Sequence, residues 1–234
     1  GRIIRDKDGN FVKNVEHKDA TDEERLVKEV NTGIYCFDGK SLKYALNKLT
    51  NNNAQGEYYL PDCLEIILNS GKNVNSFIID DASEFYGVNS RVQLAEATKI
   101  MQNRINTNLM TQGVTIVDPS NTYISAGVKV GMDTVIMPGT VIEGNSEIGE
   151  NCTIGVNCHI VNSIIGNNTS VVSSVLTDAK VGNNTTVGPF AYLRPKSNIG
   201  DNARIGDFVE IKNSTVGEQT AVAHLTYVGD SDVG

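Results

Sequence analysis

Residues 124–160 read ISAGVKVGMDTVIMPGTVIEGNSEIGENCTIGVNCHI. Within this stretch an aliphatic residue returns at every sixth position, and the same interval returns from residue 181 onward, interrupted by one five-residue step. A short period sustained in this way is typical of a solenoid. The aliphatic positions are Ile124, Val130, Ile136, Ile142, Ile148, Ile154, Ile160, Val181, Val187, Leu193, Ile199, Ile205, Ile211, Val216, Val222 and Val228.

Each six-residue unit predicts one short, flat side of a triangular coil, so three units complete a turn. We expect the aliphatic side chain to point into the core. The glycine that often follows it is expected to supply permissive backbone dihedrals. The fourth residue after the aliphatic is usually small or β-branched and is expected to pack beside it near the corner. These small positions are Val128, Thr134, Thr140, Ser146, Cys152, Cys158, Thr185, Ala191, Ser197 and Ala203, so the two cysteines are predicted to be structural.

The sequence before residue 113 has a different character, because strand-like and helix-like segments alternate there. This alternation is typical of an α/β domain, although the segment is too short for a whole one. The chain also begins at Gly1 without a methionine, which suggests a fragment. The pattern predicts strands at 3–5, 11–16, 29–37 and 74–79, and helices at 41–49, 60–68 and 91–112.

Composition limits the classes of function. The net charge of −8 and the isoelectric point near 4.9 argue against a general nucleic-acid binder, which needs a basic face. The sequence shows neither a signal peptide nor an apolar run long enough for a membrane span. The four cysteines form no CxxC pair, so we expect four reduced, buried thiols in a cytoplasmic protein.

Basic residues are rare in the repeats, and four of them gather in one place. Residues 113–234 hold six basic and twelve acidic residues, and four of the six basic ones lie within residues 194–212. Arg194 and Lys212 are 18 residues apart in an unbroken repeat, so they should stack on one face, roughly 4.8 Å apart. Stacked like charges are destabilising unless an anion bridges them, which favours a phosphate site. Two solvated side chains that splay apart remain the alternative.

His224 follows Lys212 by two six-residue units. Histidine titrates near neutrality and is the usual general base, so His224 is a candidate for that role. A single histidine is more often structural, and this alternative stays open.

With these residues in view, the whole chain resembles the bacterial bifunctional N-acetylglucosamine-1-phosphate uridyltransferase / glucosamine-1-phosphate N-acetyltransferase family. Several strings, in order and across both halves, carry the resemblance. They are Gly1-Arg2-Ile3, Val15-Glu16-His17-Lys18-Asp19-Ala20-Thr21, Asn31-Thr32-Gly33-Ile34, Asn51-Asn52-Asn53-Ala54-Gln55-Gly56-Glu57-Tyr58-Tyr59, Gly87-Val88-Asn89, Gly188-Pro189-Phe190-Ala191, Leu193-Arg194-Pro195, Gly206-Asp207-Phe208-Val209-Glu210-Ile211-Lys212 and His224-Leu225-Thr226-Tyr227.

The resemblance implies an α/β part followed by an all-β solenoid. Residues 1–90 would be the C-terminal part of the uridyltransferase, nucleotide-sugar domain. Residues 91–112 would form a linker helix, and 113–234 an incomplete left-handed parallel β-helix, the acetyltransferase domain. That handedness comes from the resemblance, because parallel connections are usually right-handed. The family associates as homotrimers with the acetyltransferase site between subunits.

The resemblance also implies two reactions. The β-helix would transfer acetyl from acetyl-CoA to glucosamine 1-phosphate. The N-terminal half would then join N-acetylglucosamine 1-phosphate to UMP from UTP, with Mg²⁺, giving UDP-N-acetylglucosamine for cell-wall synthesis and diphosphate. The partners would be these small molecules, with no nucleic acid and no membrane.

Individual residues acquire roles by the same resemblance. Arg194 and Lys212 would hold the sugar phosphate, Tyr227 would bind substrate, and His224 would be the catalytic base that deprotonates the amine. The UDP-N-acetylglucosamine site would be lined by Gly1, Glu16, Asn31 and Asn89, with Asn89 also touching Mg²⁺. Alternatively, the two asparagines cap turns and Glu16 is a strand-end carboxylate.

The chain departs from the family by lacking the glycine-rich nucleotide loop, the principal Mg²⁺-binding aspartate and the last coils, so we expect the fragment itself to be inactive. Two other functions are alternatives. One is a sugar-phosphate nucleotidyltransferase with a non-catalytic β-helix, and the other is a scaffold or binding module. Neither requires a cationic pair beside a histidine.

Overall fold

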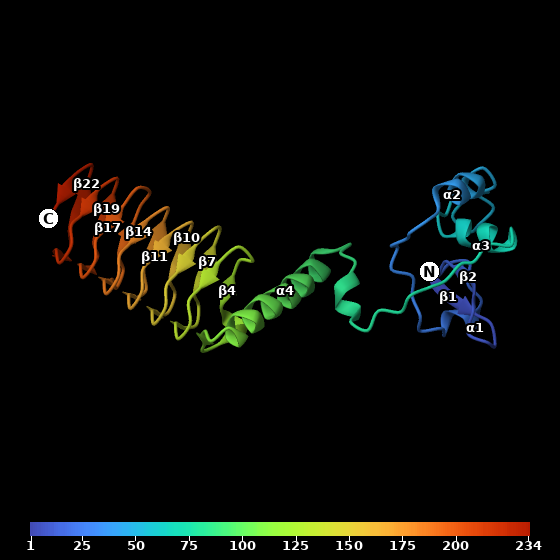
Figure 1. Ribbon diagram of the computed structural model, residues 1–234, viewed down its shortest axis with the longest axis horizontal. Helices are drawn as coiled ribbons and strands as arrows, with labels where there is room; N and C mark the ends of the chain where they lie inside the picture. The colour runs from blue at the N-terminus through green and yellow to red at the C-terminus, as the bar shows by residue number, and fades with distance from the viewer. The chain divides into compact units, whose positions relative to one another are not determined.

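The computed structural model describes residues 1–234, which form two compact units, Gly1–Tyr86 and Gly87–Gly234 (Figure 1). No helix in the chain has the length and apolar character required to cross a bilayer.

The first unit contains one small sheet and several short helices. Strand β1 (Arg2–Arg5) pairs antiparallel with β2 (Phe11–Val15), and a turn that contains Gly9 joins them. The apolar centre is formed where α2 (Gly39–Leu46) and α3 (Asp62–Asn69) pack together around Ala45, Cys63 and Ile67. The remaining elements are α1 (Asp22–Arg25) and the 3₁₀ helix η1 (Ala82–Phe85).

Two predicted strands of this unit are wrong. Residues 29–37 make only an isolated bridge between Val30 and Arg2, and residues 74–79 form no strand. A strand requires a neighbour that completes its ladder of hydrogen bonds. Apolar alternation alone does not provide one, which is why sequence periodicity overpredicted the sheet.

The second unit begins with the long helix α4 (Arg91–Thr111), capped by the Ser90 hydroxyl. Its C-terminal half packs on the first coil of the solenoid, where Leu109 joins the apolar core. Gln102 and Asn106 each donate hydrogen bonds from the side-chain amide to the carbonyl oxygens of Pro119 and Thr122, at 2.9–3.0 Å. The helix therefore satisfies backbone groups at an end of the solenoid that would otherwise be open.

Substitution of Asn106 tests this capping role. Asn106→Ala removes two hydrogen bonds to buried carbonyl oxygens and is expected to lower the free energy of unfolding by about 1–2 kcal/mol. Urea unfolding of the solenoid, followed by circular dichroism, measures this change. Asn103→Ala is the matched control, because Asn103 lies exposed on the same helix. Equal unfolding midpoints for the two variants would show that the cap contributes nothing.

The solenoid is a parallel coil of three flat faces, each a sheet of seven strands (Figure 1). The 3₁₀ helix η2 (Pro119–Asn121) lies between the first strand of face 1 and the first strand of face 2. Face 1 consists of β3 (Thr115–Ile116), β6 (Val135–Ile136), β9 (Thr153–Ile154), β12 (Ser170–Val171), β15 (Thr186–Val187), β18 (Arg204–Asp207) and β21 (Ala221–His224).

Faces 2 and 3 repeat this arrangement. Face 2 consists of β4 (Tyr123–Ile124), β7 (Val141–Glu143), β10 (His159–Val161), β13 (Val175–Thr177), β16 (Tyr192–Leu193), β19 (Glu210–Lys212) and β22 (Tyr227–Gly229). Face 3 consists of β5 (Lys129–Val130), β8 (Glu147–Ile148), β11 (Ile164–Ile165), β14 (Lys180–Val181), β17 (Asn198–Ile199), β20 (Thr215–Val216) and β23 (Asp232–Val233).

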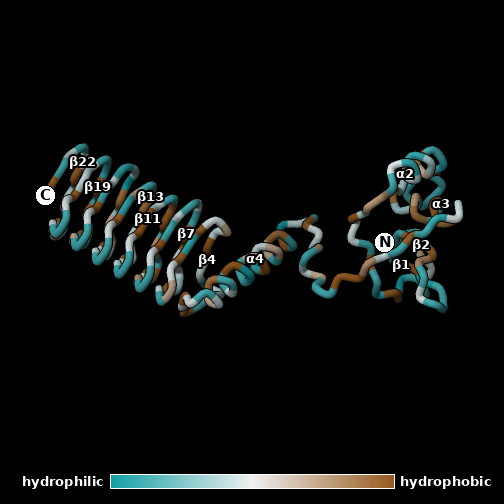
Figure 2. The backbone as a smooth tube through the Cα atoms, in the orientation of Figure 1, coloured by the Kyte–Doolittle hydropathy of each residue, from teal (hydrophilic) through white to brown (hydrophobic).

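The predicted aliphatic side chains pack in the apolar core of the coil, and most of them are fully buried. Figure 2 shows hydrophobic residues recurring along the coil. Between residues 161 and 180, where the six-residue interval fails, Ile165, Val171 and Leu176 continue the core. Strand partners there are 16 or 17 residues apart (His159 with Val175, Val175 with Tyr192), so shorter corners absorb the missing residues. The predicted parallel solenoid is therefore confirmed.

The small positions are buried as well, and their hydroxyls connect neighbouring coils. Thr134 Oγ1 donates to the Gly149 carbonyl oxygen (2.8 Å) and accepts from the Cys152 backbone N–H (2.9 Å). Such bonds satisfy buried backbone groups at the corners. Cys152 occupies an equivalent position, and burial raises the pKa of its thiol. All four cysteines are free, but Cys36 is exposed, so the prediction of four buried thiols is wrong for that residue.

The predicted role of the glycines is wrong in its mechanism. Among the glycines that directly follow an aliphatic position, only Gly188 has a positive φ. The others are required by close approach: a Cβ on Gly149 would lie 2.8 Å from the backbone nitrogen of Asn167 in the next coil. The left-handed corners are instead mostly asparagine and aspartate, which tolerate that conformation best after glycine. They are Asp133, Asn151, Asn157, Asn162, Asn168, Asp178, Asn184, Asn202, Asn213 and Asp230.

Candidate functional site

Arg194 and Lys212 lie on adjacent coils of face 2. Leu193 and Ile211 are partners in β16 and β19, and the backbone N–H of Arg194 donates to the Ile211 carbonyl oxygen at 2.8 Å. Arg194 directly follows Leu193 and Lys212 directly follows Ile211, so the two basic residues lie next to each other on neighbouring coils. This is the stacking that the 18-residue separation predicted.

Arg194 also has a partner that the sequence did not predict. Its Nη1 donates to Glu210 Oε1 at 2.8 Å, and both side chains are about two-fifths exposed. The hydrogen bond to this carboxylate raises the pKa of Arg194, and the guanidinium lies 6.0 Å from the centroid of the Tyr192 ring. Because Arg194 presents several donors, it can hold Glu210 and still offer N–H groups to an anion.

Tyr227 completes a column on the same face. It is the strand partner of Glu210, which in turn pairs with Tyr192. The Tyr227 ring folds across Gly229, where a Cβ would come 2.3 Å from the phenol oxygen. Gly229, the partner of Lys212, thus leaves room for the ring beside the cationic pair.

His224 lies at the end of β21 on face 1, one corner away from this column. Its strand partner is Asp207, and the Leu225 N–H donates to the Asp207 carbonyl oxygen at 3.0 Å. The chain turns at Leu225, and the Thr226 hydroxyl fixes the turn by donating to the His224 carbonyl oxygen at 2.7 Å. The exposed imidazole and Tyr227 therefore flank a single corner.

In the first unit, three of the four predicted nucleotide-sugar residues come together. The Gly1 nitrogen lies 3.2 Å from Glu16 Oε2, and the Asn31 N–H donates to the Gly1 carbonyl oxygen at 3.1 Å. Asn14 donates from Nδ2 to Glu16 Oε1 at 3.2 Å. Asn31 Oδ1 also accepts from the Gly33 N–H at 2.9 Å, so the turn-capping alternative is satisfied as well.

Asn89 belongs to the second unit, directly before the helix cap Ser90, and its backbone N–H donates to Gln93 Oε1 at 2.8 Å. Mg²⁺ prefers carboxylate, phosphate and water oxygens in octahedral geometry. No three His, Cys, Asp or Glu side chains of the chain come together as a metal site, and Asn89 offers one neutral amide oxygen. The residues present do not make a Mg²⁺ site by themselves.

Sequence reasoning missed Tyr192, Asp207 and Glu210. A signal for them exists in the repeat arithmetic, because Tyr192, Glu210 and Tyr227 are separated by 18 and 17 residues, one coil each. Extending the stacking argument from the two cations to every polar residue one coil apart would have found this column.

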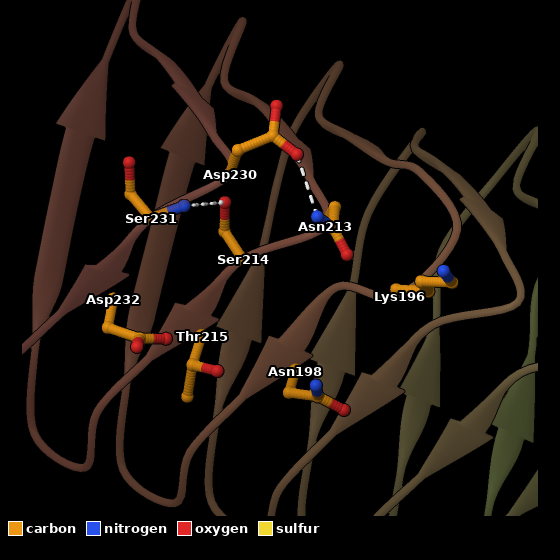
Figure 3. Close-up of a pocket in the computed structure, with 8 residues that line it drawn as sticks. All are labelled: Lys196, Asn198, Asn213, Ser214, Thr215, Asp230, Ser231 and Asp232. Carbon is orange, nitrogen blue, oxygen red and sulfur yellow. Dashed lines mark hydrogen bonds between the residues drawn. The ribbon is translucent and has the colours of Figure 1, made fainter.

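A shallow polar hollow of about 500 Å³ lies at the next corner, between faces 2 and 3 (Figure 3). Asn213 donates to Asp230 at 2.7 Å across it, and Lys196 stands at one side. None of the predicted site residues lines this hollow. Its lining is Lys196, Asn198, Asn213, Ser214, Thr215, Asp230, Ser231 and Asp232.

The repeats of the coil match a known family model. The family described as bacterial transferase hexapeptide (six repeats) matches residues 127–162 and 178–213, within the coil. The coil therefore carries the hexapeptide repeats that this family model describes.

The particular match is to the bifunctional protein GlmU, which confirms the resemblance drawn from the sequence strings. All 234 residues match the proteins of that name from Clostridium beijerinckii and Geobacillus sp. at 55% identity, and the one from Clostridioides difficile at 52%. The chain spans about half the length (51%) of these relatives.

Solved structures give weaker likenesses. A UDP-N-acetylglucosamine acyltransferase from Campylobacter jejuni is 18% identical with a TM-score of 0.40, covering 50% of this chain and 63% of that one. The acetyltransferase domain of PglB from Neisseria gonorrhoeae is 14% identical with a TM-score of 0.39, covering 53% of this chain and 65% of that one. Likenesses at this level support no statement on substrate.

Proposed function

We propose that the second unit provides the acceptor site of an acetyltransferase that acts on glucosamine 1-phosphate with acetyl-CoA as donor. The observation that carries this proposal is the placement of Arg194 and Lys212 on adjacent coils, with His224 at the corner beside Tyr227. The match to the bifunctional GlmU proteins supports it.

The chemistry follows from these positions. The cationic pair binds the phosphate, with Arg194 as a directional fork of donors and Lys212 as a compact charge. The sugar amine attacks the thioester carbonyl only as the free base, so a group must accept its proton. His224 accepts it, the C–S bond breaks, and CoA leaves as the thiol. Tyr227 contacts the sugar from the edge of the same face.

Arg194→Gln tests the phosphate assignment. Removal of a charge-assisted contact of about 1.5–3 kcal/mol is expected to raise the KM for glucosamine 1-phosphate about 10- to 100-fold. The KM for acetyl-CoA should not change. Steady-state CoA release by the full-length protein that the gene encodes measures both constants. Arg204→Gln is the matched control, because Arg204 is exposed on face 1 of the neighbouring coil. Equal KM values for the two variants would place the phosphate elsewhere.

The first unit supports a second proposed activity, uridylyl transfer from UTP to N-acetylglucosamine 1-phosphate. Gly1, Glu16 and Asn31, which lie together in the first unit, would contact UDP-N-acetylglucosamine. Mg²⁺ would need oxygen donors in addition to Asn89. Formation of UDP-N-acetylglucosamine from UTP, with loss of sugar-nucleotide binding on Glu16→Gln, tests this proposal.

We also propose a homotrimer. Phe190, Phe208 and Leu225 occupy left-handed corners on three successive coils, where most other corners carry polar residues, and all three are exposed. The two phenyl rings stack with centroids 5.2 Å apart. Exposed apolar stripes of this kind commonly lie in contacts between subunits. Sedimentation of the wild type beside Phe208→Ser tests whether this edge holds copies together.

A further inference from the structure

Asp207 and His224 stand opposite each other on β18 and β21 of face 1. In a parallel ladder, partner residues on neighbouring strands project their side chains from the same face, about 4.8 Å apart. A carboxylate and an imidazole with this spacing can meet by rotation about their side-chain bonds.

The fold itself does not require a carboxylate at this position. Asp207 directly precedes a residue with left-handed backbone conformation at the corner. The residues at the equivalent position one and two coils earlier are Pro189 and Val172. Proline and valine precede the same kind of corner without a side-chain hydrogen bond. The corner therefore does not need the Asp207 carboxylate as a hydrogen-bond acceptor. Its half-buried carboxylate forms no ion pair or hydrogen bond with another side chain of the structure. Pro189, below it, has no donor to offer, and His224 is above it.

We propose that Asp207 is a positioning residue for His224: its carboxylate accepts a hydrogen bond from one ring nitrogen, so that the other faces the substrate amine as the proton acceptor. This inference rests on the proposed acetyl transfer. A histidine that takes up a proton becomes a cation, and an oriented carboxylate both selects the tautomer and balances that charge.

The proton and electron pairs balance without any further reactant. The amine nitrogen forms a bond to the thioester carbonyl carbon, and its proton passes to the ring nitrogen of His224. The C–S bond breaks, and the imidazolium returns the proton to the departing sulfur. Asp207 stays ionised throughout and touches neither substrate.

The test is a double-mutant cycle in the protein as encoded, with CoA release as the readout. Asp207→Asn is expected to lower kcat on the order of 10-fold or more, with both KM values unchanged. In the His224→Ala background the same change should have no further effect, because it acts only through the imidazole. Asp207→Glu should restore part of the rate. Asp133→Asn, at a left-handed corner far along the coil, is the matched control.

A second readout does not depend on turnover. Nitrogen NMR of the His224 ring should show one tautomer in the wild type and a mixture in Asp207→Asn. An unchanged kcat and tautomer in Asp207→Asn would overturn the inference alone, and so would an equal loss of rate in both backgrounds. A wild type that releases no CoA would overturn the proposed function and this inference together.

Discussion

His224→Ala is expected to slow CoA release from acetyl-CoA and glucosamine 1-phosphate about 10²- to 10⁴-fold, the usual contribution of a general base. The variant should fold normally, because the imidazole is exposed and lies outside the apolar core. The KM for glucosamine 1-phosphate should change little, since the phosphate contacts on face 2 remain. Steady-state kinetics of the protein as encoded measures both quantities.

The chain offers a matched control in His159. This histidine is also exposed on the coil, in β10 of face 2, where its Nε2 lies 2.9 Å from Glu143 Oε2. Its removal to alanine should leave the rate within about twofold of the wild type. If both variants lose activity equally, the effect comes from the fold and not from proton transfer. If neither loses activity, another group accepts the proton.

The second large effect concerns stability. Ile160 in β10 is fully buried, and Ile160→Ala is expected to lower the free energy of unfolding by about 2–5 kcal/mol, because it removes apolar contacts and leaves a cavity. In a solenoid each coil packs only on its neighbours, so a cavity in the middle weakens two interfaces at once. Denaturant unfolding of the second unit, followed by circular dichroism, measures the loss.

Ile164→Ala is the control for this prediction. Ile164 is four residues further along, but its side chain points outward from β11 and is 46% exposed. The same chemical change there should alter stability by no more than about 0.5 kcal/mol. Equal destabilisation by the two substitutions would contradict the assignment of inward and outward faces.

The sequence predicted the solenoid well, for a physical reason. Every six-residue unit meets the same environment, so a residue such as Ile136 or Ile154 repeats information already present in its neighbours. The prediction failed where the corners shorten, near Ile165 and Leu176, because a change in corner length alters the interval without altering the core. Aliphatic residues still occupy the core positions in this segment.

The first unit was less predictable because its structure depends on contacts between distant segments. The segment 29–37 has strand-like alternation, yet only Val30 finds a partner. The candidate site shows the same division. Repeat arithmetic placed Arg194 and Lys212 on adjacent coils, whereas the ion pair of Arg194 with Glu210 depends on side-chain conformation, which the periodicity does not determine.

The most direct test of the central claim is product analysis. The protein as encoded is incubated with acetyl-CoA and glucosamine 1-phosphate, without UTP, and the sugar phosphates are examined by mass spectrometry. We predict N-acetylglucosamine 1-phosphate and an equal amount of free CoA. If glucosamine 1-phosphate remains unmodified in an otherwise active preparation that forms UDP-N-acetylglucosamine, the solenoid is a scaffold and the acetyltransferase assignment is wrong.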